Sequence, residues 1–236
     1  MPTVGVSLHF LNLTNLLPKI MTLKSFSLEA ADELVLRYPA LSALREPVVK
    51  SVEILCASIR GGGKILTCGN GGSASDAEHI VGELVKSFIL PRPITPKQRE
   101  QLEQSDFADW ETFADKLQQG IPAIALTGHP ALSTAVSNDI APELVFAQQA
   151  YVYGRPGDAI IGLSTSGNSK NVVNALKVAR AFGLKTIGFT GSKPAQMDAL
   201  CDVIIKVPAE ETFKIQEFHL PVYHTFCIMI ERELFS

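Results

Sequence analysis

The chain has 236 residues, of which 46% are hydrophobic and 19% are charged, and these values predict a globular protein with a large core, built as one large domain or two small ones. Its net charge is −3 and no basic run stands out, so a nucleic-acid partner has no electrostatic support. The four cysteines are far apart and lack CxxC spacing, which argues against a disulfide framework or a zinc knuckle and indicates buried thiols in a reducing compartment.

Residues 1–27 are moderately apolar, but they have no basic start and no small-residue cleavage site, and Pro18 lies within the apolar run. These features disfavour a signal peptide or a membrane span. We interpret residues 1–27 as an extension that precedes the domain, with Met21 as an alternative natural start. No other run approaches transmembrane length, so we expect a cytoplasmic protein without a membrane partner.

Two helices are predicted between residues 28 and 60. The first ends near Pro39, and the second starts near Leu44 or Pro47 and ends at the three glycines of residues 61–63. Both helices carry an apolar stripe that needs a partner surface, which another subunit could supply.

A strand, a turn and a helix are predicted in residues 64–87. The apolar, β-branched run at 64–68 stops at a glycine-rich turn, and a helix begins around residues 73–76. Such a turn directs backbone N–H groups and the positive end of the helix toward one point, where an anion, typically a phosphate, can bind. The residues of this predicted phosphate-binding turn are Asn70, Gly71, Gly72 and Ser73. Neither GK[ST] nor GxGxxG is present, which disfavours an ordinary nucleotide site.

His79 and Glu83 lie one helical turn apart in the helix that follows, so they share a face. An imidazole and a carboxylate at this spacing suit proton transfer, or they can be two ligands of a metal. A solvated helix face that carries these two residues incidentally is an equal alternative from this stretch alone.

Residues 88–120 interrupt the pattern of strands and helices. Three prolines open the segment, and two short helices are predicted, one after Pro96 and one after Asp106 or Asp109. The segment is charged and loosely patterned, so we interpret it as an insertion that leaves the sheet. It is either a lid or interface arm, or a peripheral decoration without a chemical role.

Strands and helices then alternate to the end of the chain. Four more strands are predicted at 121–127, 158–163, 185–189 and 203–207, with helices at 131–137, 142–151, 169–182, 195–200 and 216–235. Buried strands separated by helices indicate an α/β protein whose parallel sheet is covered on both faces. Right-handed crossovers place the loops that follow the strands on one edge, where ligands of such folds bind.

A serine-rich turn, Ser164–Ser169, follows the third strand and directly precedes a helix. Its hydroxyl groups lie beside the free N–H groups of the helix start, which predicts a second phosphate cradle without a lysine. Helix capping alone is the alternative, and two such turns in one sheet favour the cradle.

The final helix carries Gln216, His219 and His224 among apolar residues, near one side of the helix. A histidine on such a helix is more often part of the core than a catalyst. Pro221 removes a backbone hydrogen bond from this helix and can bend it, so the angular argument is weak.

Three motifs together resemble the sugar isomerase (SIS) domain, and within it the sedoheptulose 7-phosphate isomerase (phosphoheptose isomerase) group. They are GNGGSASDAEH with a glutamate four residues later, STSGNS after an apolar strand, and IQEFH with a second histidine five residues on. The motifs occur in the family's order, and we assign residues 28–236 to the domain, with 88–120 as an insertion.

The resemblance implies a three-layer αβα sandwich around a five-stranded parallel sheet, and a homotetramer with active sites between subunits. It also implies a phosphosugar ketose–aldose isomerase that converts sedoheptulose 7-phosphate to D-glycero-D-manno-heptose 7-phosphate through an enediol. Such a conversion needs a base above an acidic C–H bond and an acid or metal to polarise the carbonyl.

The family's functional residues have counterparts here by position. Glu83 corresponds to the base, and His224, reaching in from a neighbouring subunit, corresponds to the acid at the oxygens. A dry site could raise the pKa of Glu83 toward the operating pH. The residues that match phosphate binding are Ser73, Ser164, Thr165, Ser166 and Ser169, and Gln216 also matches a substrate-binding position. Some members hold zinc (Zn²⁺), and the matching residues are His79, Glu83, Gln216 and His224.

Three positions depart from the heptose group. Gly128 replaces an acidic residue after the second strand, Phe213 replaces an aspartate, and Ser87 replaces an arginine, with Lys86 adjacent. These departures leave another phosphosugar open as the substrate. They also keep an alternative function, a non-catalytic phosphosugar-binding regulator or scaffold, although Glu83 and His224 favour the enzyme.

Overall fold

The computed structural model describes residues 23–236, and most of the predicted N-terminal extension lies outside the described residues. Two helices open the described chain, α1 at Ser25–Arg37 and α2 at Arg45–Arg60, joined by the 3₁₀ helix η2 at Pro39–Leu44. Proline fixes its own φ and favours a helix start, so Pro39 separates the two helices as predicted.

The sheet has five strands, all parallel, in the order β2-β1-β3-β4-β5. The strands are β1 (Ile65–Cys68), β2 (Ala123–Ala125), β3 (Ala159–Leu163), β4 (Lys185–Thr190) and β5 (Val203–Lys206). Their parallel order follows from the helical crossover between each pair of successive strands. The predicted α/β sandwich with five parallel strands is confirmed.

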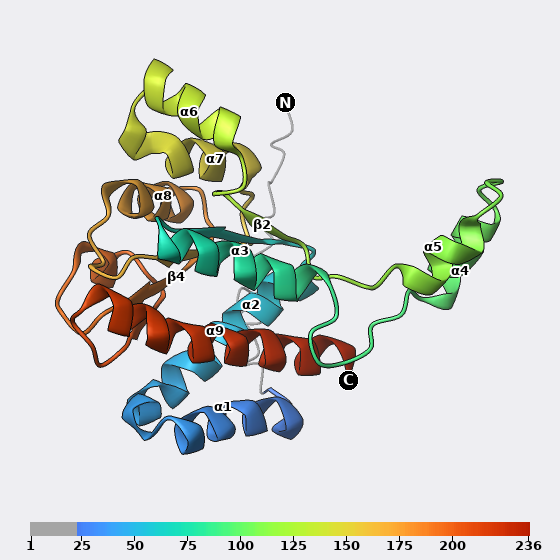
Figure 1. The fold of residues 1–236 in the computed structure, drawn as a ribbon, viewed down its shortest axis with the longest axis horizontal. Helices are drawn as coiled ribbons and strands as arrows, with labels where there is room; N and C mark the ends of the chain where they lie inside the picture. The colour runs from blue at the N-terminus through green and yellow to red at the C-terminus, as the bar shows by residue number, and fades with distance from the viewer. Residues whose placement is uncertain (1–22) are drawn as a thin grey trace, which may run out of the picture.

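The helices form a layer on each side of the sheet (Figure 1). The remaining elements are α3 (Gly72–Val85), α4 (Pro96–Glu103), α5 (Trp110–Lys116), α6 (Pro130–Asp139), η3 (Pro142–Leu144), α7 (Val145–Tyr153), α8 (Lys170–Ala181), η4 (Gln196–Ala199) and α9 (Thr212–Phe235). Helices α1, α2, α3 and α9 cover one face, and α6, α7 and α8 cover the other. This arrangement puts the N-termini of α3 and α8 at the carboxyl ends of β1 and β3.

Side chains of each strand alternate between two buried clusters. Ile65 and Ile161 belong to the cluster under α2 and α9, while their neighbours Leu66 and Ile160 belong to the cluster under α7 and α8. This alternation follows from the period of two in a strand. Because both faces are buried, the strands carry continuous apolar runs.

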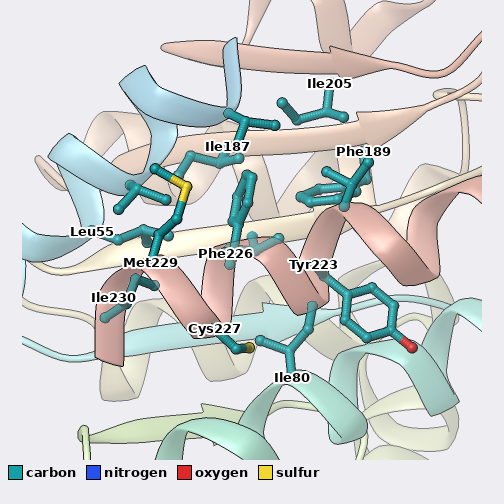
Figure 2. Packing of buried hydrophobic residues seen from close by; sticks show 14 of the residues in the cluster. Leu55, Ile80, Ile187, Phe189, Ile205, Tyr223, Phe226, Cys227, Met229 and Ile230 are labelled. Atoms are coloured by element: carbon teal, nitrogen blue, oxygen red, sulfur yellow. The ribbon is translucent and has the colours of Figure 1, made fainter. Parts of the chain in front are cut away.

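Helix α9 fills most of the space beneath the first face (Figure 2). Phe226 and Met229 point from α9 toward the sheet, and Cys227 faces Ile80 of α3. Complete burial of one such side chain contributes about 1.5–3 kcal/mol to the stability of the fold. The helix continues through Pro221, whose carbonyl accepts a hydrogen bond from Thr225 Oγ1 at 2.8 Å.

The insertion forms two short helices, α4 and α5, that stand away from the body of the domain (Figure 1). Its neck is closed by an antiparallel bridge between Pro93 and Gln118 and by a 2.7 Å hydrogen bond from the Gln119 N–H to the Arg92 carbonyl. Thr95 caps α4 through its side chain, in a capping box with Gln98. The two predicted helices of the insertion are confirmed.

Among the helices of residues 23–236, none is both long enough and apolar enough to span a membrane.

Candidate active site

The first glycine-rich turn connects β1 to α3. Gly71 has a φ of 55°, a left-handed conformation that glycine adopts without strain. A Cβ on Gly72 would lie 2.6 Å from Nε2 of Gln216, so the end of the Gln216 side chain packs directly against this glycine. Ser73 is buried, at 3% exposure, in the first turn of α3. The turn therefore presents backbone N–H groups and the positive end of α3 at the carboxyl edge of the sheet.

The second turn, Ser164–Ser169, connects β3 to α8. Ser164 Oγ lies 2.9 Å from Ser169 Oγ and accepts a 3.4 Å hydrogen bond from the Ser169 N–H. Ser169 occupies the N-cap position of α8, but its side chain does not cap the helix. Gly167 has a φ of 64°. Capping therefore does not account for the serine hydroxyls, which supports the interpretation as an anion cradle.

A pair of asparagines joins the two turns. Asn70 Nδ2 donates to Asn171 Oδ1 at 2.9 Å, and Asn171 Nδ2 donates to Asn70 Oδ1 at 2.8 Å. Asn70 was predicted from the sequence, whereas Asn171, in the first turn of α8, was missed. Its position two residues after the serine-rich turn was the available signal.

A polar pocket of about 700 Å³ opens beside the first turn. Asn70 and Asn171 line it together with Thr127, Ser133 and Asn138. The pocket follows β2, next to Gly128, where the heptose group has an acidic residue. Val145 and Phe146 add apolar side chains to this lining.

His79, Glu83 and His224 come together between α3 and α9, and we call them the proton-transfer cluster. His79 Nε2 lies 3.2 Å from Glu83 Oε1 and 3.5 Å from His224 Nε2. The Glu83 side chain is only 13% exposed. The two residues of α3 thus meet a third titratable group, although the His79 side chain is 42% exposed and this face of α3 is partly solvated.

His224 belongs to the same chain as His79 and Glu83 in this cluster. Helix α9 packs on α3 within one chain, so His224 lies beside His79 of its own chain. The expectation that His224 serves the site of a neighbouring subunit stays a prediction. Burial lowers the pKa of His224, His79 lowers it further, and Glu83 acts in the opposite direction. His224 therefore holds its proton less tightly than an unperturbed histidine.

Two residues at the end of α3 complete the surroundings of the cluster. Lys86 Nζ lies 2.6 Å from Glu83 Oε2, so each carboxylate oxygen of Glu83 has its own partner. The ring of Phe88 lies 5.6 Å from that of His224. The sequence reasoning noted Lys86 only as a neighbour of Ser87 and did not identify Phe88 as part of the site.

Tyr223 and Asp76 contact His79 from the opposite side of its ring. The Tyr223 hydroxyl lies 3.1 Å from His79 Nδ1 and donates to Asp76 Oδ1 at 3.2 Å. Burial raises the pKa of Tyr223 well above its usual value, and the charge of Asp76 raises it further. Burial also raises the pKa of Asp76.

A buried ion pair lies beneath the end of α3. Arg92 Nε donates to Glu231 Oε1 at 2.7 Å, and the arginine also donates to the carbonyls of Leu84 and Glu83 at 2.9 and 3.0 Å. Glu231 accepts three backbone N–H bonds from residues 88–90 at 2.8 to 2.9 Å. The pair fastens the start of the insertion to α9 and to the last turn of α3, which carries Glu83. It was missed because the two residues are 139 positions apart.

Gln216 and His219 lie elsewhere on α9. Gln216 packs against Gly72 at the phosphate-binding turn, and the eight residues from Gln216 to His224 span about 12 Å of helix. Within one chain, Gln216 therefore lies apart from His79, Glu83 and His224. Its roles as a metal ligand and as a substrate-binding residue stay predictions. His219 is fully buried against Phe189, and burial lowers its pKa to about 4, as in a core histidine.

Zinc fits the other three residues in chemical type. Two imidazoles and one carboxylate are ligands that zinc prefers, and donors about 2.0–2.1 Å from a tetrahedral ion lie roughly 3.3 Å apart, close to the 3.2 and 3.5 Å observed. However, no group of three His, Cys, Asp or Glu side chains among residues 23–236 is arranged as a ready metal site. The three residues therefore match zinc in donor type and in the distances between the donors, and they do not form a ready site.

Comparisons with known proteins agree with this architecture. A family profile described as the SIS domain matches residues 29–119 and 104–191. The chain is similar to the phosphoheptose isomerase of Aliarcobacter butzleri, with 40% identity over 194 residues that cover 82% of this chain and 89% of the relative. It is also similar to the phosphoheptose isomerase of Burkholderia pseudomallei (strain 1710b), with 37% identity and coverage of 89% and 93%.

Solved structures give the same result. The phosphoheptose isomerase from Neisseria gonorrhoeae superimposes with a TM-score of 0.66 at 32% identity, covering 87% of this chain and 93% of that one. The phosphoheptose isomerase from Francisella tularensis gives a TM-score of 0.66 at 26% identity, covering 86% and 94%.

Proposed function

The chain belongs to the SIS domain family and, within it, to the phosphoheptose isomerases, and on that premise we propose that it interconverts sedoheptulose 7-phosphate and D-glycero-D-manno-heptose 7-phosphate through an enediol. The single observation that carries the mechanism is the proton-transfer cluster, in which a nearly buried carboxylate faces two imidazoles. Both the base and the acid of an aldose–ketose isomerisation are thereby close together.

The phosphate end of the substrate is bound by the two turns. Backbone N–H groups at the N-termini of α3 and α8 and the hydroxyls of Ser73, Ser164, Thr165, Ser166 and Ser169 donate to the phosphate oxygens. Asn70 and Asn171 hold the turns at a fixed separation through their paired amides. Gln216 completes this end from α9.

The proton steps use Glu83 and His224. The Glu83 carboxylate takes a proton from C1 of the ketose while His224 gives a proton to the carbonyl oxygen at C2, which yields the enediol. Glu83 then returns its proton to C2, and His224 recovers a proton from the oxygen at C1, so that the aldehyde forms. No atom is gained or lost overall, and both residues regain their starting states.

The active sites lie between subunits in this proposal. The family resemblance implies a homotetramer with active sites between subunits. In this proposal the turns of one subunit serve with the cluster of another. Exposed apolar residues on α1 and α9, including Leu36, Phe213 and Leu220, provide surface for such contacts.

His79, Glu83 and His224 are proposed as ligands of a zinc ion, with any fourth ligand coming from outside this set. When bound, the ion supplies Lewis-acid polarisation of the substrate's carbonyl oxygen. We further propose a cytoplasmic location, which suits a phosphorylated substrate and four free cysteines among residues 23–236.

The function is tested by incubating the purified protein with sedoheptulose 7-phosphate, with zinc or with a chelator, and following aldose phosphate signals by NMR. We expect turnover in the wild type and its loss in Glu83→Gln. Binding of the sugar phosphate without turnover in any condition would contradict the enzyme and favour the regulator. Chelator sensitivity decides whether zinc takes part.

The position of the site is tested by mixing two inactive variants, Glu83→Gln and a variant with Ser164 and Ser166 both changed to alanine. Hybrid oligomers recover activity if one substrate is held between subunits, because each hybrid then contains some intact sites. No recovery after the subunits have exchanged would place a complete site in each chain.

A further inference from the structure

We propose that Tyr223 and Asp76 are positioning residues that hold His79 in the tautomer with its proton on Nδ1, so that the lone pair of Nε2 faces Glu83 and His224. The inference rests on the proposed function only for its consequence in turnover, because the tautomer itself follows from contacts within this chain.

The direction of the hydrogen bonds follows from counting protons. The Tyr223 hydroxyl has one proton and two neighbours, Asp76 Oδ1 at 3.2 Å and His79 Nδ1 at 3.1 Å. The hydroxyl donates its proton to Asp76 Oδ1, as the 3.2 Å hydrogen bond shows. The tyrosine oxygen is then an acceptor toward the ring, and the proton between it and His79 must belong to Nδ1.

The burial of the group makes the alternative direction costly. Tyr223 is 1% exposed, and Asp76 Oδ2 is buried without a hydrogen-bond partner in the described part of the chain. If the hydroxyl donated to His79 instead, Asp76 would lose its side-chain donor as well. A buried charge without a donor is strongly disfavoured, so the contacts select one arrangement.

The consequence appears on the other side of the ring. With Nδ1 protonated, His79 Nε2 presents a lone pair 3.2 Å from Glu83 Oε1 and 3.5 Å from His224 Nε2. His79 Nε2 is then an acceptor beside Glu83 Oε1 and His224 Nε2, and it can receive a proton or bind a metal cation. A histidine that ligates a metal usually donates its other ring N–H to a fixed acceptor, and loss of that acceptor weakens metal binding about 10–100-fold.

The test is the tautomer of His79, read from ¹H–¹⁵N correlation spectra of ¹⁵N-histidine protein without metal, with the signal assigned by His79→Gln. The chain has five histidines, so the spectra are simple. We expect a protonated Nδ1 in the wild type. In Tyr223→Phe we expect the proton to move to Nε2, where it can bond Glu83, and the zinc affinity to fall about 10–100-fold.

Tyr153→Phe is the matched control, because Tyr153 packs on His129 away from the cluster, and it should leave both readouts unchanged. If Tyr223→Phe does not fold, the wild-type spectrum decides alone, since a proton on Nε2 there overturns the proposal. An unchanged tautomer and zinc affinity in folded Tyr223→Phe overturns it too. A wild type that shows the Nδ1 tautomer but no turnover would leave this inference standing and remove the isomerase.

Discussion

The phosphate-binding turns and the proton-transfer cluster share helix α3 but differ in construction. Each turn is one short contiguous stretch at the start of a helix, and its backbone supplies most of its chemistry. The cluster instead combines α3 with a residue 145 positions away on α9, and hydrogen bonds of Tyr223 and Arg92 support it from below. Loss of one hydroxyl from a turn should therefore weaken substrate binding and leave kcat nearly unchanged, whereas kcat should depend on single side chains of the cluster.

The largest expected effect is the loss of the base. Glu83→Gln keeps the size of the side chain but cannot accept a proton from carbon, so kcat should fall about 10²–10⁴-fold with little change in KM. Steady-state assays with sedoheptulose 7-phosphate give both constants, and the unfolding midpoint checks the fold. Glu78→Gln, on an exposed position of the same helix, is the control. A fully active Glu83→Gln protein would end the account of the cluster.

Breaking the buried ion pair should mainly affect stability. Arg92→Met leaves the carboxylate of Glu231 buried without its cationic partner, so the free energy of unfolding should fall by about 3–5 kcal/mol. Urea denaturation measures the loss. Arg99→Met, which removes an exposed pair with Asp115 on the insertion, should cost about 0–1 kcal/mol. Equal losses in the two variants would mean that Arg92 does not anchor α3.

The turns are tested by removing one hydroxyl. Ser166→Ala deletes a donor to a charged phosphate, worth about 1.5–3 kcal/mol, so KM should rise roughly 10-fold or more while kcat changes little. Ser105→Ala on the insertion, where the hydroxyl bonds only a nearby carbonyl in the described structure, serves as the control. A fall in kcat at constant KM would place Ser166 in the chemical step. It would mean that the turns and the proton-transfer cluster do not differ in role as proposed.

Acid should weaken the same anchor. Burial alone would raise the pKa of Glu231, but three backbone N–H groups and Arg92 outweigh it and lower the pKa below its usual 4.5. The ionised form therefore contributes stability above pH 4.5, and this contribution is lost as the pH falls through the lowered pKa. The difference in unfolding free energy between wild type and Glu231→Gln should narrow below pH 4.5, as urea denaturation at several pH values would show. A constant or widening difference would contradict this assignment.

The smallest effect is expected for the end of the insertion. Replacing residues 96–116 by a short glycine–serine loop keeps the neck at Pro93 and Gln118, and so keeps Arg92 in place. Turnover should then stay within about twofold of the wild type. A large loss would show that α4 and α5 act as a lid or an interface arm.

The sequence was sufficient for the parts of the molecule that depend on local patterns. The strands, the two turns, the interruption at Pro39 and the helices of the insertion were all predicted, because periodicity, glycine and proline act over a few residues. His79 and Glu83 were found in the same way, from their spacing on one helix.

The sequence was insufficient where contacts join distant segments. Arg92 and Glu231 look like surface charges until α9 packs beneath the insertion, and the role of Tyr223 depends on which residue its hydroxyl meets. Gln216 was grouped with His224 although the rise of the helix separates them. These features are decided by the packing of α3 on α9, which no local pattern encodes.

The most direct test of the central claim is isomerisation of sedoheptulose 7-phosphate in D₂O, followed by NMR of the product. If Glu83 exchanges its proton with solvent at the enediol, the aldose should carry deuterium at C2, and Glu83→Gln should form no labelled product. Aldose that Glu83→Gln forms as fast as the wild type, with or without deuterium, would contradict the role of Glu83. No aldose at all, from protein that binds the sugar phosphate, would contradict the account.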